Sequence, residues 1–223
     1  MQNDYQLLTF NIMALHLGEI APDFVADSTE GIIFFHKWIQ NHWAVLFSHP
    51  SDFTPVCTSE LGAMAKLKDE FINRNTKVLA ISVDSIQSHK RWIQDINETQ
   101  QTTVDFPVIA DPHKKVAYLY DMIHPFVSPT DTVRSVFIIG PDKRIKSILM
   151  YPGFTGRNFQ EILRIIDSLR LTNNYKVATP ANWEHGQECL VLPAVKTEEL
   201  ASNFPKGYKI INPYLRITPQ PNI

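Results

Sequence analysis

The stretch WAVLFSHPSDFTPVCTSEL, residues 43–61, decides the fold. It opens with a short apolar run and continues into a loop bracketed by two prolines, which predicts a buried strand followed by a turn. A helix is expected to begin at Pro55 with Thr54 as its N-cap, because proline is tolerated at the first helical position. Apolar residues then recur at spacings of three and four as far as Phe71, which is typical of one face of an amphipathic helix.

Cys57 falls in the first turn of this predicted helix, where backbone N–H groups lack partners and the helix dipole is positive. Such a setting stabilises a thiolate, the nucleophilic form of cysteine. A lone cysteine after a strand is more often a small buried hydrophobic residue. The two prolines, the threonine three residues before Cys57 and the glutamate three residues after it favour a reactive cysteine.

Strands and helices alternate along the rest of the chain. Strands are predicted at 77–83 and 104–110, helices at 85–98 and 114–120, and a hairpin at 135–150 followed by a helix at 159–171. Pro107 lies inside the second of these strands, which predicts an edge or bulge position there. This order predicts an α/β fold in three layers with a central mixed sheet, compatible with a thioredoxin-like core.

Length and composition restrict the function classes. The chain has 223 residues, of which 44% are hydrophobic and 20% charged, and its formal net charge is -2. This balance suits one domain with a modest appendage and gives no reason to expect nucleic acid or an anionic membrane as a partner. No run approaches the roughly 20 apolar residues that cross a bilayer. Two cysteines do not make a disulfide framework, so a reducing compartment and a cytoplasmic location are expected.

Three segments are expected. Residues 1–12 carry Asp4 and no basic residue, which fits neither a secretory nor a mitochondrial leader, so they are interpreted as a disordered tail. Residues 13–172 form the α/β domain. The composition shifts near residue 173 and prolines recur from residue 180 onward, so 173–223 are interpreted as a small second domain or arm. Packing on its own core or on another subunit would both satisfy this arm.

The spacing of Pro50, Thr54 and Cys57, P-x-x-x-T-x-x-C, resembles the active-site motif of the peroxiredoxins, the thiol peroxidases of the thioredoxin superfamily. The wider string FSHPSDFTPVCTSEL is similar to their one-cysteine class, the sixth subfamily in mammals. The segments MALHLGEIAPDF, from Met13, and YLRITPQP, near the end, resemble the same class. The resemblance implies an antioxidant enzyme that reduces hydrogen peroxide and organic hydroperoxides, phospholipid hydroperoxides among them, through a Cys57 sulfenic acid and without a bound cofactor.

The resemblance also implies roles for four further residues. Arg134 opens RSVFIIGPD and would alone be interpreted as a solvated charge, but it matches the family's active-site arginine. Glu60, in TSE, would orient that arginine, and Arg157, in TGRN, matches a secondary arginine. His49, just before Pro50, is either a hydrogen-bond donor in the pocket or a histidine held by packing.

The second thiol decides the subclass. Two-cysteine relatives carry a resolving cysteine in a V-C-P-A-x-W context, whereas the matching stretch here, VATPANW at 177–183, has none. Cys189, in the apolar ECLVLP, is expected to be structural within a buried strand. The resemblance therefore implies an external thiol such as glutathione as reductant, a glutathione transferase as a candidate partner, and a homodimer with arm exchange.

Some members of the class also hydrolyse phospholipids with a Ser/His/Asp set. His36 and Asp142 match the histidine and the aspartate, but His42 occupies the serine position. Without a nucleophile there, acyl transfer has no attacking atom, so little or no phospholipase activity is expected from this site.

Other functions remain as alternatives to an enzyme. A peroxide sensor or chaperone-like redox protein would use the same cysteine, with turnover incidental. A disulfide reductase is disfavoured because the sequence has no C-x-x-C, and a metal centre because the eight histidines show no H-x-x-x-H pattern or similar pairing with cysteine.

Overall fold

The computed structural model describes residues 14–223, which form two compact units. One unit ends at Arg157 and the other runs from Asn158 to Ile223. The tail expected at residues 1–12 lies outside the described residues. The helix expected over 159–171 is part of the second unit, whereas the sequence analysis set the division after residue 172.

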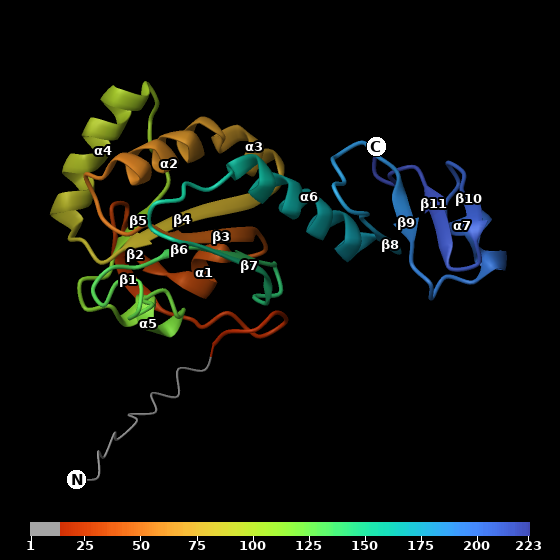
Figure 1. Ribbon diagram of the computed structural model, residues 1–223, viewed down its shortest axis with the longest axis horizontal. Helices are drawn as coiled ribbons and strands as arrows, with labels where there is room; N and C mark the ends of the chain where they lie inside the picture. The colour runs from red at the N-terminus through yellow and green to blue at the C-terminus, as the bar shows by residue number, and fades with distance from the viewer. Residues whose placement is uncertain (1–13) are drawn as a thin grey trace, which may run out of the picture. The chain divides into compact units, whose positions relative to one another are not determined.

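A seven-stranded mixed sheet forms the centre of the first unit (Figure 1). Its strand order is β2-β1-β5-β4-β3-β6-β7, with β3 parallel to β4, β4 parallel to β5, and the other neighbours antiparallel. The strands are β1 (Val25–Ser28), β2 (Gly31–Phe34), β3 (Trp43–Ser48), β4 (Thr76–Ser82), β5 (Val108–Ala110), β6 (Arg134–Ile139) and β7 (Ile145–Tyr151).

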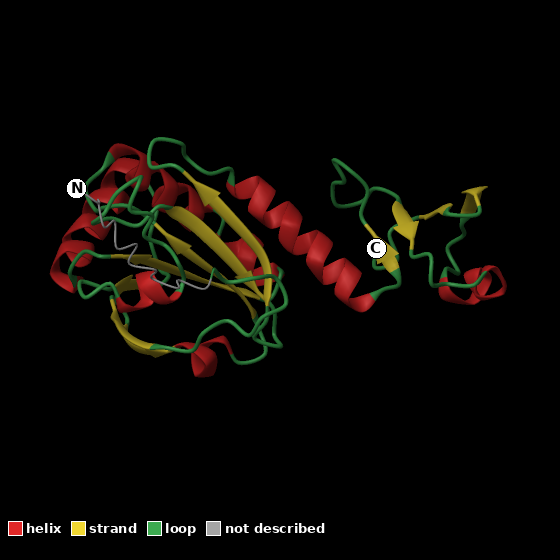
Figure 2. Ribbon diagram, turned by 60° about the horizontal axis from the view of Figure 1, so that its bottom comes forward, coloured by secondary structure: helices red, strands yellow, loops and turns green. Residues whose placement is uncertain are grey.

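Helices cover both faces of this sheet (Figures 1 and 2). In Figure 1, α2, α3 and α4 lie above the sheet, and α1 and α5 lie below it. The helices are α1 (Phe35–Ile39), α2 (Pro55–Lys66), α3 (Lys68–Asn73), α4 (Ile86–Gln100) and α5 (Lys115–Leu119). The α/β class with three layers and a central mixed sheet is therefore confirmed.

The position of β3 in the sheet explains why the apolar run at the start of the stretch 43–61 is continuous. The strand lies between β4 and β6, and all six of its residues are buried. A strand that is covered on both faces needs a continuous apolar run rather than an alternating one. Below the sheet, Leu46 of β3 belongs to a buried core with Phe35, Leu79 and Tyr120. This packing fixes the end of β3, from which the loop to α2 departs.

Strand β5 differs from the expectation. It begins at Val108, after Pro107, and it lies inside the sheet between β1 and β4. The predicted edge or bulge position of Pro107 is wrong because the proline stands just outside the strand, where its missing N–H removes no ladder hydrogen bond. Its carbonyl still accepts a hydrogen bond from Ala80 N at 3.1 Å.

The second unit contains α6 (Phe159–Asn174), whose N-cap Asn158 accepts from Gln160 N at 3.0 Å. An antiparallel sheet follows, with the order β10-β11-β9-β8. The remaining elements are β8 (Val177–Ala178), β9 (Cys189–Val191), a 3-10 helix η1 (Thr197–Glu199), α7 (Leu200–Asn203), β10 (Lys209–Asn212) and β11 (Leu215–Thr218). Trp183, Cys189 and Phe204 belong to a core of its own. The segment in which prolines recur, from residue 180 onward, thus contributes strands to a small sheet.

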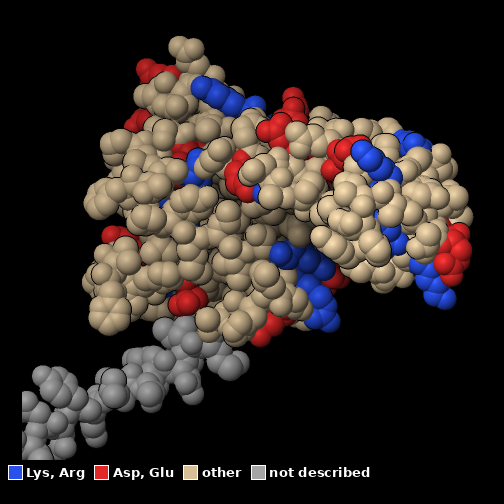
Figure 3. Space-filling view, turned by 45° about the vertical axis from the view of Figure 1, so that its right-hand side comes forward, with Lys and Arg blue, Asp and Glu red and all other residues tan. Residues whose placement is uncertain are grey.

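The charged side chains on the surface agree with the formal net charge of -2, which favours neither sign strongly. Figure 3 shows acidic and basic side chains interspersed among other residues on the face that it draws. Within residues 14–223, no helix combines the length and the apolar character that crossing a membrane requires.

Candidate active site

Cys57 lies in the first turn of α2, with Thr54 at the N-cap and Pro55 at the first helical position, as the sequence predicted. The Cys57 side chain is fully buried. The Thr54 hydroxyl donates to the backbone oxygen of Ser51 at 2.9 Å instead of accepting from the helix. The first N–H groups of a helix have no acceptor within it, so the turn that holds Val56 and Cys57 presents N–H groups near the sulfur.

Arg134, the first residue of β6, contacts the sulfur directly. Its Nη1 donates to Cys57 Sγ at 3.3 Å and to Glu60 Oε2 at 2.7 Å. Its Nε and Nη2 both donate to the backbone oxygen of Gly153, at 2.9 and 2.7 Å. Arg134 is only 2% exposed, so the solvated charge that the isolated sequence suggested is in fact a buried one with a fixed guanidinium plane.

Glu60 links the two arginines of the site. Its Oε1 accepts from the backbone N and Nε of Arg157 at 2.7 and 2.9 Å, and its Oε2 accepts from Arg157 Nη2 at 2.6 Å in addition to Arg134. Arg157 Nη1 donates to the backbone oxygens of Ser48 and Ser135, at 2.8 and 3.0 Å. Although burial acts to raise it, the hydrogen bonds and charge of Arg157, with the charge of Arg134, hold the pKa of Glu60 below its usual value.

The charges of this group do not cancel. Two guanidiniums and one carboxylate, all buried, leave one positive charge in excess beside Cys57. A thiolate 3.3 Å from Arg134 would make the group neutral. The arrangement therefore stabilises the nucleophilic form of the cysteine.

A pocket of about 540 Å³ opens beside the group. Its lining includes Pro50, Thr54 and Val56 from the active-site loop and α2, together with Arg134. Most of its exposed lining is apolar, and Phe154 contributes a ring that is 98% exposed. The pocket thus ends at the residues that flank the buried sulfur.

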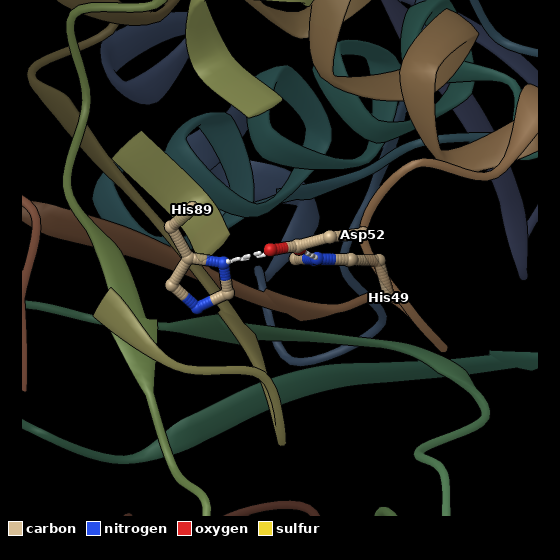
Figure 4. A group of neighbouring side chains, drawn as sticks. All are labelled: His49, Asp52 and His89. Atoms are coloured by element: carbon tan, nitrogen blue, oxygen red, sulfur yellow. Dashed lines mark hydrogen bonds and ion pairs between the residues drawn. The ribbon is translucent and has the colours of Figure 1, made fainter. Parts of the chain in front are cut away.

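His49 lies in the interior rather than along this pocket. Its side chain is fully buried, its ring centroid lies 5.0 Å from that of Trp92, and its Nε2 contacts Asp52 Oδ1 at 3.0 Å. Asp52 also contacts Nδ1 of His89, which lies on α4 (Figure 4). Neither Asp52 nor His89 is predicted as a site residue from the sequence. Asp52 stands three residues after His49 within the motif, but nothing near His89 in the sequence points to a partner 37 positions away.

The same three residues are the group in the described chain whose atoms could approach a metal ion, since their ligand-type atoms lie within 4.8 Å of one another. The ring nitrogens of His49 and His89 already lie at hydrogen-bond distance from the Asp52 oxygens, between 2.8 and 3.0 Å. The geometry therefore fits a hydrogen-bonded cluster.

Each residue matched to the phospholipase set contacts another group of the protein at hydrogen-bond distance. His36 Nε2 contacts the backbone oxygen of Ala21 at 2.7 Å, and His42 Nδ1 contacts that of Ile39 at 3.1 Å. Asp142 accepts from Lys146 at 2.6 Å.

The fold and the site define a class: a thioredoxin-like α/β protein with a buried cysteine at the start of a helix and against a buried arginine. Comparison with known proteins gives the family. Residues 17–148 match the AhpC/TSA family, and residues 168–207 match the C-terminal domain of 1-Cys peroxiredoxin.

Individual relatives agree. A 1-Cys peroxiredoxin of Dictyostelium discoideum is 53% identical over 93% of this chain and 86% of its own length. A mutant of peroxiredoxin 6 from Arenicola marina has 45% identity and a TM-score of 0.89, with 94% of this chain and 100% of that chain covered. A yeast mitochondrial 1-Cys peroxiredoxin, described in terms of thiol resolution through glutathione and thioredoxin systems, has 45% identity and a TM-score of 0.86 over 92% and 99%. The chain belongs to the one-cysteine peroxiredoxins of the AhpC/TSA family, and it is a thiol peroxidase.

Proposed function

We propose that this protein reduces hydrogen peroxide and organic hydroperoxides with Cys57 as the nucleophile, in antioxidant defence. Family membership supplies the reaction class. The observation that carries the residue assignment is the contact of 3.3 Å between Arg134 Nη1 and Cys57 Sγ, within a buried group that has one positive charge in excess.

The reaction uses each part of the group. The Cys57 thiolate attacks one peroxide oxygen in line with the O–O bond, which breaks as the S–O bond forms. The other oxygen leaves as hydroxide or alkoxide and takes up a proton, and Cys57 is left as a sulfenic acid. Arg134 and the N–H groups at the start of α2 stabilise the charge that develops on the two oxygens.

Thr54 and Glu60 position the reacting groups and take no part in making or breaking bonds. The Thr54 hydroxyl donates its hydrogen bond to Ser51 O, so its oxygen is available to accept a hydrogen bond from the O–H of an incoming hydroperoxide. Glu60 holds Arg134 against the sulfur, and Arg157 holds Glu60 with three hydrogen bonds. Pro50 lines the same pocket as Arg134.

The pocket favours substrates with an apolar body. A volume of about 540 Å³ is far larger than hydrogen peroxide requires, and its mainly apolar lining suits the carbon chain of an organic hydroperoxide. Phospholipid hydroperoxides are one class that would place a carbon chain there.

An external thiol is proposed to reduce the sulfenic acid. Cys189 lies in β9 of the second unit, where it is buried and where burial raises the pKa of its thiol, so it is a poor attacking group. The yeast relative's description names glutathione and thioredoxin systems. We propose glutathione or a similar thiol as the reductant, with a glutathione transferase as a candidate partner and a homodimer as the working form in the cytoplasm.

The test joins stopped-flow kinetics to intact-mass analysis. With excess peroxide and no added thiol, wild type should consume one thiol per chain far faster than free cysteine does. Cys57→Ser should abolish this reaction, and Cys189→Ser should retain it with the added oxygen on Cys57. A wild-type rate like that of free cysteine would refute the enzyme and favour the sensor interpretation. A disulfide that forms in wild type and disappears in Cys189→Ser would refute the external thiol.

Two simpler measurements address the remaining assignments. Light scattering coupled to gel filtration should give the mass of a dimer, and a monomer would contradict the homodimer. Calcium-independent phospholipase activity should be negligible in wild type because His42 stands at the serine position. Robust activity in wild type would contradict that reasoning, whereas a gain in His42→Ser would support it.

A further inference from the structure

The active-site loop carries a buried His–Asp–His group that the chemistry above does not use (Figure 4). Asp52 lies in the loop between Pro50 and Thr54, and its carboxylate lies between the rings of His49 and His89. Both histidines are fully buried and Asp52 is 6% exposed. Bulk water does not reach these side chains, so their polar atoms need hydrogen-bond partners within the protein.

The hydrogen bonds of this group require more protons than two neutral imidazoles hold. His89 Nε2 lies 3.1 Å from the backbone oxygen of Ile109, which can only accept, so Nε2 carries a proton. His89 Nδ1 lies 2.8 Å from Asp52 Oδ2, and His49 Nε2 lies 3.0 Å from Asp52 Oδ1. Each of these three contacts needs its own proton, whereas two neutral imidazoles supply only two.

The position of the extra proton follows from the surroundings of each member. An imidazolium at His49 would bury a second N–H at Nδ1, which has no hydrogen-bond partner within residues 14–223. Burial also lowers the pKa of His49. At Asp52, His89 Nδ1 lies within hydrogen-bond distance of both oxygens, at 3.0 and 2.8 Å, which suits an N–H shared between the two oxygens of a carboxylate. In agreement, although burial acts to raise it, hydrogen bonds from both histidines hold the pKa of Asp52 well below its usual value. A nearby second carboxylate, Asp84, accepts from the backbone N of Asp52 at 3.0 Å.

We propose that His89 is doubly protonated in the working enzyme and that its ion pair with Asp52 is a positioning device for the active-site loop. The pair joins α4 to the loop that carries Pro50 and Thr54. If His89 loses the extra proton, one of its ring nitrogens turns a lone pair toward an acceptor, either Asp52 or Ile109 O. The loop then loses an anchor, because one of the hydrogen bonds that join it to α4 is replaced by two facing lone pairs.

Asparagine at position 52 offers a decisive variant. Its amide N–H₂ can donate to Nδ1 of a neutral His89, while its oxygen accepts from His49 Nε2 and His89 Nε2 still donates to Ile109 O. Asp52→Asn thus satisfies every contact without the extra proton. Asp52→Leu has a similar size and satisfies none of the contacts made by the carboxylate.

The first readout is the NMR spectrum of full-length protein labelled with ¹⁵N at its histidines, with the His89 signals assigned by their loss in His89→Gln. At neutral pH, both ring nitrogens of His89 should be protonated in wild type, and only one in Asp52→Asn. A neutral His89 in wild type would overturn the proposal. This readout does not depend on peroxide chemistry, so it stands apart from any failure of the proposed function.

The second readout is the rate of peroxide reduction at neutral pH, which rests on the proposed role of Cys57. Asp52→Asn should lose about fivefold at most, since it exchanges a charged for a neutral hydrogen bond. Asp52→Leu should lose about tenfold or more by misplacing the loop. Asp95→Asn, an exposed change of the same charge on α4, should match wild type. Equal losses in Asp52→Asn and Asp52→Leu would overturn the positioning role.

Discussion

Replacing Glu60 by glutamine removes one buried charge and keeps the shape of the side chain. In wild type, Glu60 Oε1 accepts two hydrogen bonds from Arg157, and Oε2 accepts one from Arg157 and one from Arg134. A glutamine oxygen can replace Oε1. Its amide N–H₂ would then stand where Oε2 was, facing two guanidinium nitrogens that can only donate.

The cost follows from leaving two arginines without their carboxylate. Removing one partner of a buried ion pair destabilises a protein by about 3–5 kcal/mol. Because Arg134 loses the acceptor that holds Nη1 near the sulfur, the rate of peroxide reduction should fall as well, by about a hundredfold for one misplaced donor. Glu70→Gln is the matched control, since Glu70 pairs with Arg74 at 2.6 Å on the surface of α3. An exposed pair of this kind contributes about 0.3–0.5 kcal/mol.

Urea unfolding of both variants, followed by tryptophan fluorescence, gives the comparison. The pKa of Glu60 is below its ordinary value of 4.5 in the folded protein, so its contribution is present above that value and is lost as the pH falls through the folded pKa. The difference between wild type and Glu60→Gln should therefore narrow in acid. Equal destabilisation by Glu60→Gln and Glu70→Gln at neutral pH would refute the buried charge arrangement.

Four further changes test other parts of the protein. Arg134→Lys should slow peroxide reduction about a hundredfold, because one ammonium cannot reach the sulfur, Glu60 and Gly153 O together; a rate near wild type in stopped flow would contradict this. Arg157→Met removes the excess positive charge, so alkylation of Cys57 by iodoacetamide at neutral pH should slow about tenfold, and unchanged alkylation would contradict the charge count. Phe154→Ser should raise KM for an apolar hydroperoxide several-fold and leave hydrogen peroxide kinetics unchanged; an unchanged KM for the apolar hydroperoxide would place the ring outside substrate binding. Cys189→Ser should lower the stability of the second unit by about 1–3 kcal/mol in thermal unfolding, because it buries a hydroxyl in an apolar core, and an unchanged midpoint would contradict that.

The architecture of the first unit was predictable because its strongest signals are local. The apolar run of β3, the proline and threonine at the start of α2, and the turn between β6 and β7 each specify one element within a few residues. Pro107 shows where local reading fails. Its position inside an apolar run suggested an edge strand, but the strand begins one residue later, and its place between β1 and β4 depends on pairing that sequence spacing does not reveal.

The site was predictable only in part for the same reason. Cys57, Thr54 and Glu60 stand within seven positions, so the motif itself indicates them. Arg134 and Arg157 lie 77 and 97 positions from their partners Cys57 and Glu60, and only the family resemblance pointed to them. Asp52 and His89 carry no such signal, because a buried histidine on an amphipathic helix has the same sequence pattern as one that fills space.

The second arginine accounts for a feature that the motif alone leaves unexplained. Glu60 is needed to hold Arg134 in place, but its charge cancels that of Arg134, so a single Arg134–Glu60 pair would attract a thiolate less than an uncompensated arginine would. Arg157 engages the same carboxylate and restores one positive charge, while Ser48 O and Ser135 O take up its remaining donors. The site thus separates two demands that one arginine could not meet: Glu60 fixes the geometry of Arg134, and Arg157 keeps that geometry electropositive. The proposed reduction of peroxide at Cys57 depends on both, because the nucleophile must be ionised and the guanidinium must face it.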